Sequence, residues 1–298
     1  SINGDVTFDV AAFNVQQDIT TKNGGNIEII SNKLNFDQAS IITSAGQLTL
    51  PVLAASNDLT LIAASNLKLN AVEITGGDLV LNAGSGTLDI QGSILASNNV
   101  TMLAGDVNIN NTIAEIDAGG TVRFSDQPDG GMGMGLGGFQ SDKLRLSTND
   151  LLTITATNIL LESVNGITLL GDLNIKSMII PLTISANTFN MVNDIGVTVT
   201  TMELGGGLDF SDTTISVPDA LVIDIDGAFA MNGALSATEA VSIVAGMGIT
   251  MGALSSIKTT NDAIILKSNT NNINLGLLNA GTGAVEITAT AGDILNNN

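Results

Sequence analysis

Three basic residues close to a glycine-rich stretch are the first candidates for chemistry in this sequence. Arg123 and Arg145 are 22 positions apart, and Lys143 lies beside the second of them, in a chain with nine lysines and arginines. Guanidinium groups bind carboxylates and sulfates with two parallel hydrogen bonds. The pattern predicts a patch for a carboxylate or a sulfated sugar, or the basic group of a polysaccharide lyase. The alternative is neutralisation by the nearby aspartates Asp126, Asp129 and Asp142.

The glycine-rich stretch itself, GGMGMGLGG at residues 130–138, contains the spacing G-x-G-x-x-G. That spacing marks a dinucleotide site when it follows a strand and opens a helix, but no helical pattern follows here. We therefore expect a loop insertion at about 126–140, with Met132, Met134 and Leu136 as exposed apolar residues that contact a partner protein.

Composition excludes several classes of function. The chain has no cysteine, histidine, tryptophan or tyrosine, which removes thiolate and imidazole chemistry and the aromatic platforms of sugar-cleaving enzymes. Its 29 acidic and 9 basic residues give a net charge of −20, which repels nucleic acid and anionic lipid. No apolar run reaches the roughly 18 residues that span a bilayer. We expect no enzymatic activity, no cofactor, no nucleic-acid partner and no membrane insertion.

Acidic turns are a second candidate site, because Ca²⁺ binds carboxylate and carbonyl oxygens. The residues concerned are Asp106, the pair Asp224 and Asp226, and the pair Asp58 and Asp78. Calcium-binding β-rolls carry a tandem G-G-x-G-x-D array, which does not occur here. The interpretation as solvated turns is therefore favoured over a calcium site.

A repeat of about 21 residues indicates the elements that would position these residues. Short apolar-x-apolar strands begin at steps of 20, 21, 22, 22 and 23, on Leu59, Leu79, Val100, Val122, Leu144 and Ile167. The pattern returns at Val241, Ile264 and Val285. Upstream, Ile27 and Leu48 are 21 apart, but the step to Leu59 is only 11, which suggests a partial coil or a register shift.

Each repeat holds three short strands with period-2 alternation, joined at Gly, Asn, Asp or Ser. A fixed period with little helix predicts an all-β, right-handed parallel β-helix with three strands per coil of about 21 residues. We expect one domain over 1–298, with an irregular section at about 177–218 that keeps strand character but loses register. Arg123 and Arg145 would occupy the same outward slot of successive coils.

The recurrent segments GDLVLNAGSGTLDIQGSI, GDVNINNTIAEIDAGGTV and GAVEITATAGDILN resemble the repeats of the filamentous haemagglutinin family, the β-helical shafts of bacterial adhesins and autotransporter passengers. The secretion-domain signature and the C-terminal barrel of such proteins are not found in this sequence. The resemblance implies an extracellular or cell-surface location and a role in adhesion or fibre building. It implies as partners a second copy stacked head to tail, adjoining β-helix domains, or a host or neighbouring-cell surface.

Overall fold

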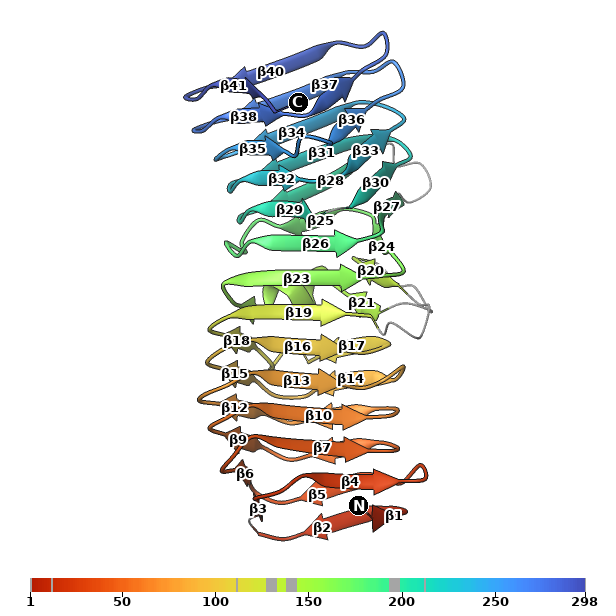
Figure 1. Cartoon of the computed structure of the whole chain (residues 1–298), viewed down its shortest axis with the longest axis vertical. Coiled ribbons are helices and arrows are strands. Elements are labelled where there is room, and N and C mark those ends of the chain that lie inside the picture. The colour runs from red at the N-terminus through yellow and green to blue at the C-terminus, as the bar shows by residue number, and fades with distance from the viewer. Residues whose placement is uncertain are drawn as a thin grey trace. The chain divides into compact units, whose positions relative to one another are not determined.

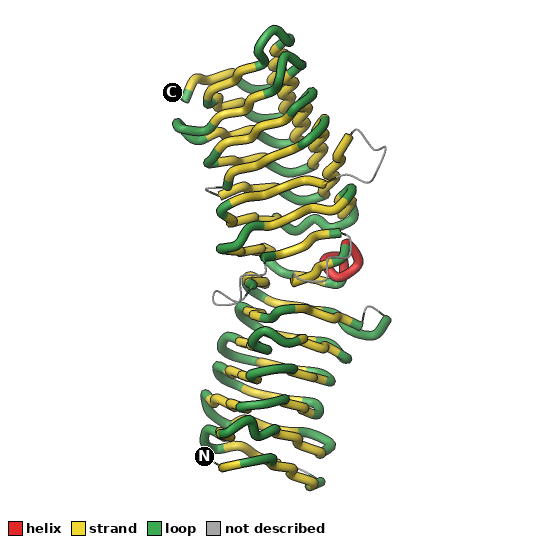
Figure 2. Tube along the Cα trace, turned by 90° about the vertical axis from the view of Figure 1, so that its right-hand side faces the viewer, coloured by secondary structure: helices red, strands yellow, loops and turns green. Residues whose placement is uncertain are grey.

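The computed structural model describes residues 2–11, 13–110, 112–126, 133–137, 144–192, 199–211 and 213–297. They fold as an all-β parallel β-solenoid of about 13 turns, with about 21 residues and three strands per turn. Figure 1 labels the strands in chain order, and Figure 2 distinguishes strands, loops and the short helix α1 (Thr148–Leu152). No helix in the described part of the chain is long and apolar enough to cross a membrane.

The chain forms two compact units, Ser1–Met132 with Asp142–Leu144 and Asn149–Ile159, and Gly133–Ser141 with Arg145–Thr148 and Leu160–Asn298. In each unit, successive coils place one strand on each of three faces. Strands β21 (Leu144–Leu146) and β23 (Asn158–Ser163) have residues in both units.

The three faces of the first unit are parallel sheets. The first face contains β1 (Ile2–Asn3), β4 (Ile19–Lys22), β7 (Ser40–Ser44), β10 (Leu59–Ala63), β13 (Leu79–Asn82), β16 (Val100–Leu103) and β19 (Thr121–Ser125). The second contains β2 (Val6–Asp9), β5 (Ile27–Ile30), β8 (Leu48–Leu50), β11 (Leu67–Leu69), β14 (Thr87–Ile90) and β17 (Asp106–Ile109). The third contains β3 (Phe13–Val15), β6 (Leu34–Phe36), β9 (Leu53–Ala55), β12 (Val72–Ile74), β15 (Ile94–Ala96), β18 (Ile116–Ala118) and β22 (Ile154–Thr155).

The second unit repeats this arrangement. Its first face contains β26 (Leu182–Ala186), β29 (Leu208–Ser211), β32 (Phe229–Met231), β35 (Ile249–Met251), β38 (Ile273–Leu275) and β41 (Ile294–Asn296). The second contains β20 (Met134–Leu136), β24 (Ile167–Leu170), β27 (Thr188–Val192), β30 (Thr214–Val217), β33 (Ala234–Ala237), β36 (Ser256–Lys258) and β39 (Leu277–Asn279). The third contains β25 (Leu173–Ile175), β28 (Val199–Leu204), β31 (Ala220–Ile225), β34 (Val241–Ala245), β37 (Ile264–Ser268) and β40 (Val285–Ala289).

The apolar stack that the sequence predicts is confirmed in its first part. On the first face of the first unit, parallel register joins in order Leu59, Leu79, Val100 and Val122, all fully buried. Each coil thus covers the apolar side chains of its neighbour, which a single coil could not remove from water. The short step before Leu59 is no register shift, because Leu48 lies on the second face of one coil and Leu59 on the first face of the next.

The later part of the predicted stack is wrong. Leu144 in β21 and Ile167 in β24 belong to one sheet, and Val122 in β19 belongs to another. The residues between β19 and β24 include the additional strand β20 and helix α1, so a constant step across them arrives on a different face. All three faces carry the same apolar-x-apolar pattern, and periodicity alone does not distinguish them.

The section predicted to lose register, residues 177–218, keeps it in the described strands. Leu182 lies opposite Leu208, and Leu173 lies opposite Met202, in parallel pairing. Thr201 donates its backbone N–H to Asp172 from 29 positions further along the chain. Longer coils, rather than a slipped register, therefore explain why the 21-residue repeat fades here.

Asp and Asn side chains at the corners bond each coil to the next. Asp58 Oδ1 accepts the backbone N–H of Asp78 at 2.8 Å, and Asp78 Oδ1 accepts that of Asn99 at 3.1 Å. Asn99 Oδ1 accepts the N–H of Thr121 at 2.8 Å. The same bond joins Asp5 to Asn26, Asn26 to Gln47, Asp18 to Ile41, Asn66 to Thr87, Asp172 to Thr201, Asn261 to Thr282 and Asn272 to Asp293. These corner bonds give the Gly-Asp and Asn-Asp pairs of the repeat a structural purpose.

Shortening one side chain of the apolar stack should destabilise the fold. Leu81 is fully buried between Leu61 and Met102 on the neighbouring coils. Leu81→Ala should lower the free energy of unfolding by about 2 to 5 kcal/mol, because it leaves a cavity. Leu95→Ala, on a side chain that is 47% exposed, should change it by less than about 0.5 kcal/mol. Urea denaturation measures both, and equal losses would contradict this account of the core.

Removing one corner bond should have a smaller, local effect. Asn99→Ala takes the acceptor from the Thr121 N–H and should cost about 1 kcal/mol, with faster amide hydrogen exchange at Thr121. Asn98 is also exposed, and its neighbouring contact is made by its backbone carbonyl, so Asn98→Ala is the matched control. Unchanged exchange at Thr121 in the Asn99 variant would show that the corner bond contributes nothing.

Candidate functional site

The arginine patch predicted from the sequence is not assembled as expected. Arg123 lies in β19, opposite Thr101 of β16, and is half-buried. Arg145 lies in β21, which belongs to a different sheet. The prediction that the two guanidinium groups occupy one outward slot of successive coils is therefore wrong, for the same reason that Leu144 leaves the stack. Lys143 lies outside the described residues.

The prediction that Met134 and Leu136 lie in an exposed loop that contacts a partner is also wrong. Met134 and Leu136 lie in strand β20, are fully buried, and pair with Ile167 and Leu169 of β24. The alternation of the two apolar residues with glycine suits a strand with one buried face, and Gly133 and Gly137 supply the left-handed φ angles of +70° and +86° at its ends. These side chains are not available to a partner. Met132 lies outside the described residues.

The acidic turns considered for calcium have other partners. Asp58 and Asp78 accept corner N–H groups, and Asp224 and Asp226 form ion pairs with Lys176. Within the described ranges, no three histidine, cysteine, aspartate or glutamate side chains are grouped so that they could hold a metal ion.

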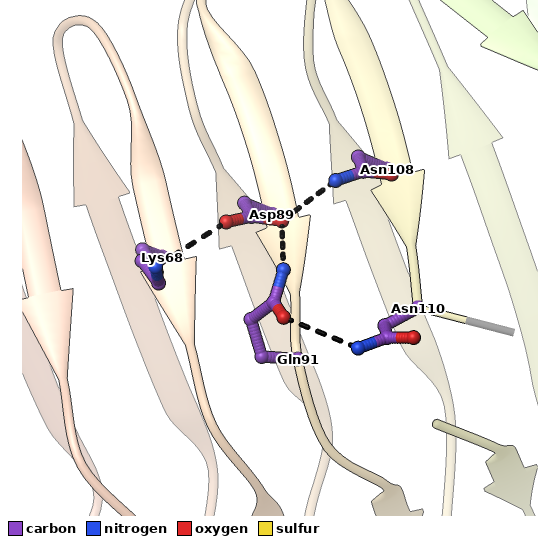
Figure 3. Close-up of polar contacts among 5 residues, drawn as sticks. All are labelled: Lys68, Asp89, Gln91, Asn108 and Asn110. Carbon is purple, nitrogen blue, oxygen red and sulfur yellow. Dashed lines mark hydrogen bonds and ion pairs between the residues drawn. The ribbon is translucent and has the colours of Figure 1, made fainter. Parts of the chain in front are cut away.

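A row of polar side chains crosses three strands on the second face of the first unit (Figure 3). Lys68 Nζ lies 3.8 Å from Asp89 Oδ2, and Asn108 donates to Asp89 Oδ1 at 2.8 Å. Gln91 donates to Asp89 at 2.6 Å and accepts from Asn110 at 3.3 Å. Because its contacts lie at the surface, this polar ladder stabilises the stacking of the coils only modestly.

A second charged group, the Lys176 cluster, lies on the third face of the second unit. Lys176 follows β25, and its Nζ lies 3.1 Å from Asp226 Oδ1 and 3.4 Å from Asp224 Oδ2 at the end of β31. Partial burial lowers the pKa of Lys176, but the hydrogen bond to Asp226 and the charge of Asp224 raise it more, so the net shift is upward. On the strand between them, Glu203 accepts a 2.6 Å hydrogen bond from Asn174.

Each unit has a surface hollow among its described residues. In the first unit, a polar hollow of about 420 Å³ lies on the third face, where the short side chain of Ala54 is placed between Asn35 and Glu73. Lys33 and Asp37 also line it. In the second unit, a groove of about 570 Å³ runs along the corner that precedes the first face, from Ile179 to Met247.

Sequence reasoning missed these groups for different reasons. Lys68 and Asp89 are 21 residues apart, one period, so aligning charged residues on the repeat would have found the polar ladder. Lys176 and its aspartates lie on either side of the lengthened coil, and a constant period does not bring them together. The groove depends on glycines and exposed apolar residues at successive corners, and the repeat of the strands does not predict what lies at the corners.

Comparison of the chain with protein-family models, with curated proteins and with solved structures found no match. The geometry described above therefore carries the functional argument.

The charge of Lys176 should contribute to stability in a defined pH range. Because its folded-state pKa lies above the ordinary value of 10.5, the contribution is fully present below the unfolded-state pKa and is lost as pH rises through the folded-state pKa. Lys176→Met should lower the thermal midpoint at neutral pH, and the difference from the native chain should shrink at strongly alkaline pH. Lys258→Met, at an exposed lysine of the same unit, should show no such trend. A pH-independent difference would contradict the ion-pair origin.

Proposed function

We propose that this chain is a non-enzymatic structural β-helix of a bacterial cell surface. It would act as the shaft of an adhesin or as the subunit of a surface filament whose copies stack end to end. The observation that carries the proposal is the stacking of the coils in parallel sheets, in which each coil is covered by its neighbour and a further coil of matching period, from the same protein or from a second copy, can be added at either edge.

The last coil of the second unit ends all three faces, on β41, β39 and β40. Its apolar side chains include Val285, Ile294 and Leu277, which are 46%, 49% and 59% exposed. Strand edges of this kind have unpaired backbone donors and acceptors and invite further strands to add. A coil of matching period would bury these side chains in the way that each internal coil buries those of its neighbour.

The first coil of the first unit presents the opposite edge. Strands β1, β2 and β3 end their sheets, and Ile2 and Val10 are exposed. A contact between unlike ends is heterologous, and such contacts propagate into open filaments instead of closing into dimers.

The remaining surface supports a structural role in the extracellular space. Outward positions carry Thr, Asn, Ser and Asp, and the net charge of −20 favours solubility of a long assembly. The repeats resemble filamentous haemagglutinin shafts, which supports adhesion to a host or neighbouring cell as the purpose. The lyase alternative loses its geometric support, because Arg123 and Arg145 lie in different sheets, and we do not propose it.

End-to-end assembly can be tested by electron microscopy and sedimentation at rising protein concentration. The native chain should form filaments, and the double variant Val285→Lys, Ile294→Lys should remain as single particles, because two charges on the last coil would be buried at each junction. Leu254→Lys is the control, since that residue is 97% exposed in a turn of the same unit. Single particles of the native chain at every concentration, or filaments of the double variant, would contradict the filament.

A further inference from the structure

The groove of the second unit lies where four successive coils turn into the first face. Ile179 stands at one end of the groove and is 83% exposed, and Met247 stands at the other end and is 50% exposed. Between them, the corners of the two middle coils carry Gly206 and Gly227. At these two corners the floor of the groove is bare backbone, and an exposed apolar side chain forms a wall at each end.

Close stacking of the coils explains the floor. A Cβ atom added at Gly206 would lie 2.2 Å from the carbonyl oxygen of Ile180, and one added at Gly227 would lie 2.5 Å from the backbone nitrogen of Gly207. Glycine is thus required at both corners by packing. Packing does not explain the two walls, because exposing the side chains of Ile179 and Met247 to water is unfavourable.

The lining is acidic as well as apolar. Asp209 projects from β29 between Thr183 and Ala230 of the adjacent strands, and Asp226 borders the second glycine corner. The lining includes these two carboxylates and no lysine or arginine. Lys176 lies outside the groove and forms ion pairs with both Asp226 and Asp224. The single positive charge of Lys176 does not balance the three negative charges of Asp209, Asp224 and Asp226.

We propose that this groove binds a short basic segment of another protein, about five residues long, with lysines or arginines between two aliphatic residues. The end walls are three coil steps apart, about 14 Å at about 4.8 Å per step, and the first and fifth residues of an extended segment lie about 13 Å apart, at about 3.3 Å per residue, with their side chains on the same face. The flanking aliphatic side chains would pack on Ile179 and Met247. The basic residues between them would then lie over the coils that carry Asp209 and Asp226.

The negative charge of the groove and of the whole chain favours a basic occupant. The stems of lysine and arginine pack against apolar surface while their charged ends reach carboxylates, and the net charge of −20 draws cationic partners towards the chain. No two of the nine lysines and arginines of this chain are adjacent in the sequence, so a second copy does not offer such a segment. The occupant is therefore a basic partner protein, distinct from the self-association proposed for the chain ends.

Fluorescence anisotropy with the purified full chain tests the proposal. The probe is a labelled peptide with blocked ends and the sequence Leu-Lys-Lys-Lys-Leu. Two comparison peptides carry glutamate in place of lysine, or glycine in place of leucine. The basic aliphatic peptide should bind, and both comparison peptides should bind at least about tenfold more weakly, because each lacks one of the two complementary features.

Variants of the chain separate the groove from general attraction to an acidic surface. Ile179→Asn and Met247→Gln should each weaken the basic peptide about fivefold, since each removes one apolar wall. Asp209→Asn should weaken it similarly and reduce the salt dependence of binding. The controls Leu254→Asn and Glu239→Gln change an exposed apolar residue and an exposed carboxylate outside the lining, and should stay within about twofold of the native chain.

Two outcomes would overturn the proposal. One is equal binding of the basic peptide by the native chain and the Ile179 and Met247 variants, which would place the peptide elsewhere on the acidic surface. The other is no saturable binding by the native chain at low ionic strength, where electrostatic attraction is strongest. Circular dichroism of each variant confirms that the solenoid is folded, so that a loss of binding reports on the groove.

Discussion

Every coil of this solenoid depends on the coil beside it for both its apolar contacts and its backbone hydrogen bonds. A single coil has no interior, because its inward leucines, isoleucines and valines are removed from water only when the next coil covers them. The stacks on the described faces show this directly, with Leu59, Leu79 and Val100 in register and fully buried. Side chains, corners and surface features are all arranged around the spacing that this stacking imposes.

The same requirement explains how much of the fold the sequence reveals. Stacking demands a repeat, and the repeat predicts a parallel β-solenoid with three strands per coil, which the structure confirms. It does not tell one face from another, because Leu48 and Leu59 carry the same local pattern on different faces. Insertions such as the one that contains Met134 and Leu136 then change the face on which the next strand lies. The glycine-rich segment predicts an exposed loop, although its alternation of glycine with apolar residues also fits a buried strand.

Polar groups are predictable from the repeat only where coils have equal length. The polar ladder of Lys68 and Asp89 follows the 21-residue period, whereas the Lys176 cluster forms across a coil of 29 residues. The predicted arginine site failed for the same reason, since an irregular section separates Arg123 from Arg145. The groove has a different origin. At its corners the coils pack so closely that only glycine fits, and the surface is left hollow between the apolar walls.

The corner bonds are all oriented the same way along the solenoid. In each Asp and Asn bond between coils described above, the side-chain oxygen of the earlier coil accepts the N–H of the later one. A coil that has already folded therefore works as a template, with an acceptor in place for the amide that arrives next. A coil added after it meets a side-chain acceptor, and a coil added before it meets a backbone donor, so the two edges of a stack of coils are chemically different.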